Sequence, residues 1–232
     1  MTTTAAAREQ GFATGRYLHS LGIDADLAPV LDVPTSRSSF IYARAFSTSP
    51  SLVASRGVSF AEGLSDAGVI ATAKHFPGLG RLSVSTDSAA GTVRATRTAL
   101  ARDLIPFKRG IAAGVPAVMV GTAGYPAYGD SLPAALSPSI VTKLLRGTLH
   151  YKGVTLSDAL DTRAVSSRLP RAQATVQAVR AGIDMAYIGA ADQATFAAVL
   201  RAAQNGTLPR PALEASYARV AALKSRFTSG LS

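Results

Sequence analysis

Short apolar runs alternate along the chain with longer stretches that carry apolar residues at helical spacing. The runs predict strands at residues 23–33, 69–76, 117–121, 153–157 and 183–188. The longer stretches predict helices at residues 50–67, 96–113, 137–149, 172–181, 191–204 and 211–227, and the chain opens in helical sequence. Strands that alternate with helices form βα units, so the pattern indicates a mostly parallel sheet.

Prolines and glycines mark where helices begin, bend or end. Pro50 occupies the start of the first long helix after the opening one, and Gly68 follows its end. Pro106 lies inside the helix predicted over 96–113. Because a proline removes a backbone donor and clashes with the preceding turn, we expect a kink there.

Two parallel architectures fit this pattern, an open doubly wound sheet and a (β/α)8 barrel. Polar residues lie where the strands end: Asp32 near the end of the first, Lys74 and His75 at the end of the second, and Asp158 after the fourth. A barrel collects its chemistry at the carboxyl ends of several strands, and the sequence has no Gly-x-Gly-x-x-Gly motif after its first strand. We therefore expect an α/β fold of the TIM-barrel type, in one domain over residues 1–232.

Composition narrows the class of protein further. The chain has 232 residues, of which 47% are hydrophobic and 16% charged, so it can bury a sizeable core. It has no cysteine, which excludes disulfides and thiolate chemistry, and no run of roughly 18 apolar residues that could span a membrane. The net charge is +10, but the basic residues are scattered without a nucleic-acid-binding motif, which disfavours DNA or RNA as the partner.

Three segments carry a resemblance to a known family. They are LAPVLDV at residues 27–33, KHFPGLG at 74–80 and VTLSDAL at 154–160. Together they resemble the N-terminal barrel domain of glycoside hydrolase family 3, in particular bacterial β-N-acetylhexosaminidases. The resemblance extends from Gly11 to about Phe227. It implies a carbohydrate substrate and no metal or organic cofactor.

The resemblance assigns roles to individual residues. Asp158 matches the nucleophile of a retaining mechanism, which would form a glycosyl-enzyme, although an aspartate after a strand also suits a helix N-cap. Lys74 and His75 match the pair that binds sugar hydroxyls, and Arg44 matches a further substrate contact, although each also suits a structural or solvated position. Asp32 is interpreted as a structural carboxylate near the site.

The loop after the second strand departs from the family pattern. Ala89 stands where the family has the histidine that acts as general acid and base, and Leu79 replaces the second histidine of the Lys-His motif. Loss of a general acid reduces rates by ~10²–10⁴. Asp87, which remains in the loop, is the candidate replacement, under the hypothesis that burial raises its pKa.

The start of the chain also departs from the family pattern. Members of the family carry two further strands before the opening helix, so the resemblance implies a barrel that is incomplete at its N-terminus. Residues 1–8 lack the basic segment and apolar core of a signal peptide. The chain as written is therefore expected to be cytoplasmic, whereas a longer form with an upstream signal would be extracytoplasmic.

Three functions remain open at this point. The first is retaining hydrolysis of O-glycosyl bonds in β-linked N-acetylglucosaminides, in carbohydrate or peptidoglycan metabolism. The second is a pseudoenzyme that binds carbohydrate without turnover, which Ala89 favours. The third is nucleic-acid binding, for which the positive charge is the only indication.

Overall fold

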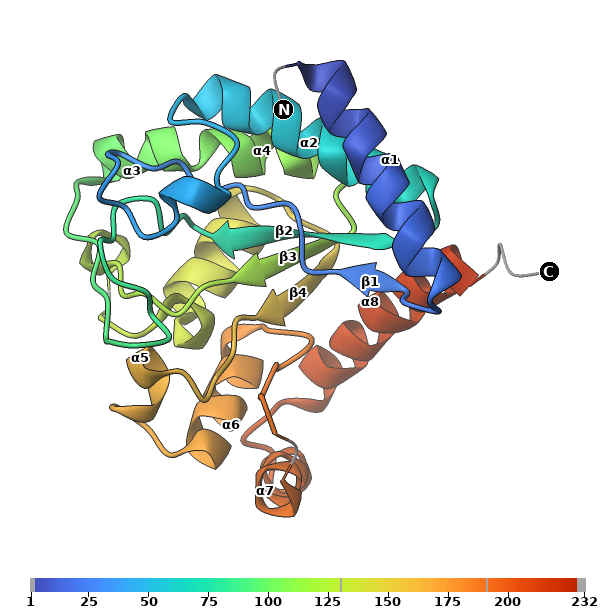
Figure 1. Ribbon diagram of the computed structural model, residues 1–232. Coiled ribbons are helices and arrows are strands. Elements are labelled where there is room, and N and C mark those ends of the chain that lie inside the picture. The colour runs from blue at the N-terminus through green and yellow to red at the C-terminus, as the bar shows by residue number, and fades with distance from the viewer. Residues whose placement is uncertain (1–2, 130, 191, 229–232) are drawn as a thin grey trace.

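The fold is built on a parallel sheet, seen in a computed structural model that describes residues 3–129, 131–190 and 192–228. Its strands are β1 (Ala25–Asp26), β2 (Ile70–Phe76), β3 (Ala117–Val120) and β4 (Val154–Ser157), in that spatial order. The strands and the helices alternate along the chain (Figure 1), as the βα pattern predicts.

Three of the five predicted strands, β2, β3 and β4, form ladders close to the predicted bounds. The first is shorter than predicted: β1 is followed only by an isolated bridge between Val30 and Lys74. Proline has no backbone N–H, so Pro29 interrupts regular pairing there, although its carbonyl still accepts from the Lys74 N–H. The fifth predicted strand, 183–188, forms one bridge beside β4 rather than a regular strand.

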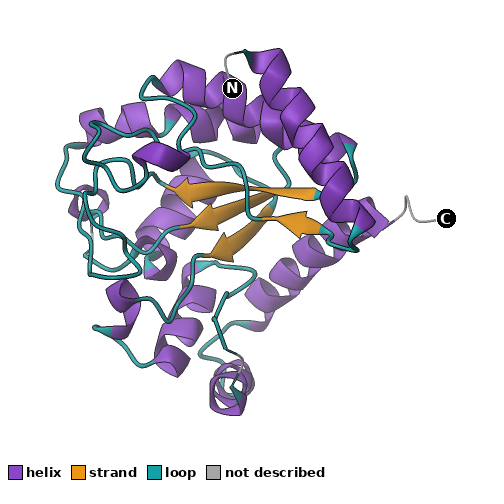
Figure 2. Cartoon of the chain, in the orientation of Figure 1, coloured by secondary structure: helices purple, strands orange, loops and turns teal. Residues whose placement is uncertain are grey.

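Helices surround the sheet (Figure 2). The α-helices are α1 (Thr4–Ser20), α2 (Pro50–Asp66), α3 (Arg97–Asp103), α4 (Ile105–Ala112), α5 (Arg163–Ser166), α6 (Arg171–Ala181), α7 (Gln193–Gln204) and α8 (Arg210–Thr228). A π-helix covers Ser139–Thr148, within the predicted helix 137–149. Three short 3₁₀ turns cover Tyr42–Arg44, Pro126–Tyr128 and Ala134–Leu136.

Local sequence accounts for the helix ends. The predicted helix 96–113 is divided at Leu104 into α3 and α4, because Pro106 lies in the first turn of α4. The side chain of Thr96 caps α3, and Gly182, with a φ of 106°, ends α6. The helix predicted over 191–204 forms as α7, and Ala191 lies outside the described residues.

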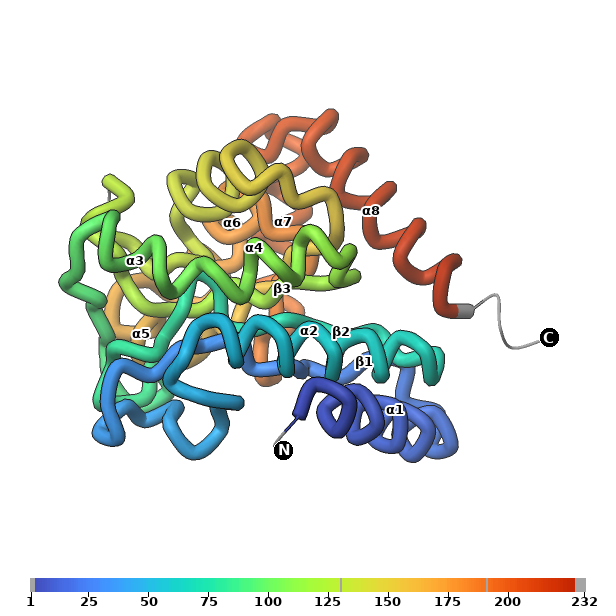
Figure 3. The backbone as a smooth tube through the Cα atoms, turned by 90° about the horizontal axis from the view of Figure 1, so that it is seen from above, coloured from blue at the N-terminus to red at the C-terminus, as the bar shows by residue number. Residues whose placement is uncertain are grey.

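The α1, α2 and α4 helices lie side by side in that order, as the views in Figures 1 and 3 agree. α2 and α4 pack against β2, and α1 packs against α2. The α1 and α2 backbones approach closely, because a Cβ at Gly11 or Gly63 would collide with backbone atoms of the other helix. In the core beneath, the rings of Phe76 and Phe107 meet edge to face at 5.3 Å. This packing fixes β2, the strand that carries Lys74 and His75.

All four strands point the same way, and the long loops gather at their carboxyl ends (Figure 1). A parallel sheet with helices outside it is the layering of a TIM-barrel wall. Within the described part of the chain the sheet does not close, because β1 and the segment 183–188 form its two ends. No helix in that part has both the length and the apolar character to cross a membrane.

Candidate active site

A cavity of about 150 Å³ lies at the carboxyl ends of the strands. All five residues predicted to act on the substrate line it, namely Arg44, Lys74, His75, Asp87 and Asp158. They come from four places in the chain: the 3₁₀ turn after β1, the end of β2, the loop between β2 and α3, and the residue after β4. Parallel strands end at one edge, which is why residues so distant in sequence meet here.

Asp158 is held in place by its neighbours. Its N–H donates to the carbonyl of Val120 at 2.8 Å, and its carboxylate accepts from the N–H of Ala159 at 2.9 Å. The N-cap alternative is wrong for this residue, because the next helix begins only at Arg163. The carboxylate therefore remains available to the cavity.

The groups around Asp158 shift the pKa of its carboxyl in opposite directions. Burial raises the pKa of the Asp158 carboxyl above its usual value, and the nearby carboxylate of Asp87 raises it further. His75 when its ring is protonated, the Ala159 N–H and the charge of Lys74 lower the same pKa. A negative charge on Asp87 thus acts on Asp158 across the cavity.

Lys74 and Arg44 bring positive charge to the same cavity. Burial lowers the pKa of the Lys74 ammonium, and the neighbouring guanidinium of Arg44 lowers it too. The carboxylates of Asp158, Asp26 and Asp32 raise it. Asp26 was not predicted as a neighbour of the site.

His75 is buried and is fixed by Asp32, which is fully buried. The Asp32 carboxylate lies 2.8 Å from Nδ1 of His75 and accepts from the Leu79 N–H at 2.6 Å. The expectation that Asp32 is a structural carboxylate beside the site agrees with this position, since Asp32 does not line the cavity. Leu79 lines the cavity, at the position of the replaced histidine.

The loop that carries Asp87 is anchored at several points. Ser85 Oγ donates to the Asp87 carboxylate at 3.0 Å, and the Arg163 N–H donates to the Asp87 carbonyl at 3.1 Å. At the start of the loop, Arg81 binds the buried carboxylate of Asp103 at 2.6 Å. Asp87 itself is exposed, so the burial invoked in the sequence-based hypothesis is absent in the free protein. Ala89 does not line the cavity.

Sequence reasoning missed several lining residues, among them Leu27, Ser85, Met119 and Tyr187. Tyr187 is 43% exposed, and its backbone N–H donates to the hydroxyl of Ser157 at 2.8 Å. The predicted strand 183–188 contained the signal, because alternate residues of an extended segment face the same side. Tyr187 therefore provides an aromatic surface at the edge of the cavity.

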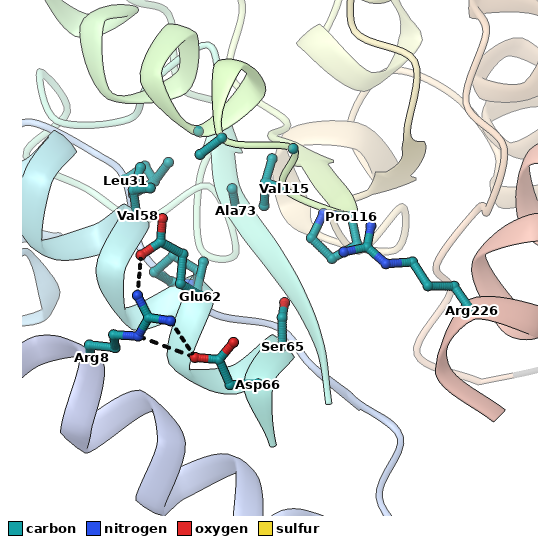
Figure 4. A pocket seen from close by; sticks show the side chains of 15 residues that line it. Arg8, Leu31, Val58, Glu62, Ser65, Asp66, Ala73, Val115, Pro116 and Arg226 are labelled. Carbon is teal, nitrogen blue, oxygen red and sulfur yellow. Dashed lines mark hydrogen bonds and ion pairs between the residues drawn. The ribbon is translucent and has the colours of Figure 1, made fainter. Parts of the chain in front are cut away.

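A larger cavity, of about 280 Å³, lies among α1, α2 and α4 (Figure 4). At its mouth Arg8 lies between Glu62 and Asp66 and binds them at 3.3 and 2.7 Å. These carboxylates already have a cationic partner, and the ion pairs join α1 to α2. In the described part of the chain, no group of three or more acidic or histidine residues is arranged to hold a metal ion.

Comparison with known proteins identifies the family. The profile of the glycosyl hydrolase family 3 N terminal domain matches residues 1–223. Beta-hexosaminidase A of Pseudoalteromonas piscicida is 34% identical over 92% of this chain, and beta-hexosaminidase LpqI of Mycobacterium tuberculosis is 32% identical over 96%. The chain spans 40% and 59% of the lengths of these two proteins.

A solved structure gives the same result. The glycoside hydrolase family 3 beta-N-acetylglucosaminidase from Paenibacillus sp. str. FPU-7 superimposes with a TM-score of 0.95 and 35% identity, over 97% of this chain and 44% of that one. The barrel-type α/β fold predicted from the strand-end residues is confirmed by this match. The chain belongs to glycosyl hydrolase family 3, as an N-terminal domain of that family.

Proposed function

We propose that this chain is the catalytic domain of a retaining glycoside hydrolase that acts on β-linked N-acetylglucosaminides. The observation that carries the proposal is the meeting of two carboxylates, Asp158 and Asp87, with Lys74, His75 and Arg44 in one cavity. Two carboxyl groups are the usual catalytic pair of retaining hydrolysis. The relatives named beta-hexosaminidase support the choice of sugar and make peptidoglycan fragments a candidate source of it.

In this proposal Asp158 is the nucleophile. Its carboxylate attacks the anomeric carbon, the bond from that carbon to the leaving-group oxygen breaks, and a glycosyl-enzyme forms. Asp87 donates a proton to the departing oxygen and later takes one from the water that hydrolyses the intermediate. A sugar bound in the cavity would cover Asp87, which supplies the burial that the free protein lacks.

The cationic and neutral polar groups bind the sugar. Lys74 and Arg44 offer only donors, which suit hydroxyl oxygens, while His75 can donate or accept. The cavity lies on one wall formed by β1 to β4, which favours a single domain over residues 1–232 as the unit of function.

Replacement of the nucleophile tests the proposal. Asp158→Asn keeps the size of the side chain and an oxygen for the Ala159 N–H, so the fold is expected to survive. Hydrolysis of an aryl β-N-acetylglucosaminide should fall to background, whereas affinity for N-acetylglucosamine should persist. An unchanged rate in the folded variant would contradict the role of Asp158.

Ala89 supports a second candidate function, carbohydrate binding without turnover. The same two measurements separate the candidates. Binding of N-acetylglucosamine with no hydrolysis of aryl or alkyl glycosides by the unaltered protein would favour the non-catalytic function. Hydrolysis that requires Asp158 would favour the enzyme.

A further inference from the structure

We propose that Asp32 is a positioning residue that fixes the tautomer of His75, so that Nε2 of the ring accepts a hydrogen bond from a substrate hydroxyl. The proposal rests on the proposed function only in taking a sugar as the ligand. Asp32 follows the first strand region and His75 lies on β2, so the two contacts between them join neighbouring parts of the site.

The geometry around Asp32 requires it to accept hydrogen bonds. One carboxylate oxygen accepts from the Leu79 N–H at 2.6 Å, and the other lies 3.3 Å from the His75 N–H and 2.8 Å from His75 Nδ1. The side chain of Asp32 is fully buried, so water cannot replace these partners. Because the Asp32 oxygen beside the ring acts as an acceptor, Nδ1 of His75 must carry the hydrogen of the bond between them.

The tautomer has a consequence on the other side of the ring. In a neutral imidazole one nitrogen donates and the other accepts, so hydrogen on Nδ1 leaves Nε2 as an acceptor. His75 lines the cavity together with Asp158, and Nδ1 of its ring is taken by Asp32. Nε2 is therefore the ring nitrogen left to meet a ligand.

An acceptor at this place complements the groups around it. Lys74 and Arg44 present only donors to the cavity, while Asp158 and Asp87 carry negative charge. A sugar hydroxyl both donates and accepts. Lys74 can donate to the hydroxyl oxygen while the adjacent His75 accepts the hydroxyl hydrogen, which selects a free hydroxyl over an ether or a deoxy position.

The test replaces Asp32 and reads the ring directly. The chain has three histidines, so two-bond ¹H–¹⁵N spectra are simple, and His19→Gln and His150→Gln assign the signals by elimination. In the unaltered protein, at a pH where the ring is neutral, we expect hydrogen on Nδ1. In Asp32→Asn we expect the amide oxygen to accept from the Leu79 N–H, so that the amide nitrogen faces Nδ1 of His75. Because the amide nitrogen is a donor, Nδ1 must then accept, and the ring hydrogen should move to Nε2.

Sugar affinity gives a second readout. By calorimetry, Asp32→Asn should weaken binding of N-acetylglucosamine about tenfold or more, because Nε2 would then present a donor where an acceptor is needed. N-acetylglucosamine methylated at the hydroxyl that His75 binds should have a low affinity for the unaltered protein. Its affinity for Asp32→Asn should be no lower. Asp184→Asn is the matched control, because Asp184 is an equally buried carboxylate that binds Arg146 and Arg219 at the opposite end of β4.

The outcomes separate the two proposals. Hydrogen on Nε2 of His75 in the unaltered protein would overturn the positioning role, and this measurement needs no variant to fold. An Asp32→Asn protein that keeps the tautomer and the affinity would overturn it as well. If His75 has hydrogen on Nδ1 but the unaltered protein binds no N-acetylglucosamine, the positioning role stands and the proposed sugar is wrong.

Discussion

Replacement of Asp87 by asparagine isolates the proton donor of the proposed mechanism. The side-chain oxygen of an asparagine can still accept from Ser85 Oγ, and the bond from the Arg163 N–H goes to the backbone carbonyl, which does not change. The loop should therefore keep its place. The substitution removes the titratable carboxyl group, which is the proposed proton donor.

The loss of rate should depend on the leaving group. General acid catalysis contributes ~10²–10⁴ in rate, which corresponds to about 3–5 kcal/mol of transition-state stabilisation. An alkyl glycoside has a poor leaving group and should lose this full amount. An aryl glycoside leaves as a stabilised phenolate and should lose far less in the step that forms the glycosyl-enzyme.

The pH profile tests the nucleophile. Asp158 attacks as a carboxylate, so kcat/KM rises as the pH increases through the pKa of Asp158. Burial raises that pKa, so the acid limb should lie above the usual aspartate range of about 4.

The assay compares kcat/KM for an aryl and an alkyl β-N-acetylglucosaminide between roughly pH 3 and 9. Asp161→Asn serves as the control, because Asp161 lies near the site, binds the Gly189 N–H and does not line the cavity. It should leave both substrates and the acid limb unchanged. Equal losses on the two substrates in Asp87→Asn would refute the assignment of Asp87, and an acid limb of the unaltered protein at or below about pH 4 would refute the effect of burial on Asp158.

Three further predictions concern binding and stability. Lys74→Ala and His75→Ala should each weaken binding of N-acetylglucosamine by ~1–3 kcal/mol in calorimetry, because polar groups in a half-enclosed site lose their partner; equal affinities would make the pair structural. Asp184→Ala should lower the free energy of unfolding by about 3 kcal/mol in urea titration, because two arginines lose a buried carboxylate, and a change below about 1 kcal/mol would contradict this. Arg8→Ala should lower the free energy of unfolding by less than about 1 kcal/mol, because its ion pairs with Glu62 and Asp66 are half-exposed. A larger loss in the same titration would show that solvent does not screen these ion pairs.

The positions of the site residues could be predicted from the sequence because they depend on strand ends. Asp158 and Lys74 follow the short runs VTLS and IATA, whose residues are mostly buried, and runs of this kind favour parallel strands. Once the sheet is parallel, the ends must share an edge. The same argument could have predicted Tyr187, because this residue lies near the end of the predicted strand 183–188.

Other features depend on tertiary contacts that a pattern of apolar residues does not contain. The segment 183–188 has the composition of a strand, but it forms only one bridge, between Met185 and Leu156. The hydrogen bond between Asp32 and His75 joins residues 43 positions apart, so only the fold reveals it. The exposure of Asp87 likewise depends on where Ser85 and Arg163 hold its loop.

The anchoring of the loop between β2 and α3 has a kinetic consequence. Arg81 ties one end of the loop to Asp103, its middle is joined to the start of α5, and Thr92 pairs with Gly124 near its far end. A segment fixed in this way loses little conformational entropy when a ligand arrives, so association needs no slow ordering step. In the proposed mechanism this loop therefore does not act as a swinging lid, so its ordering should not limit turnover, and the rate should be insensitive to solvent viscosity.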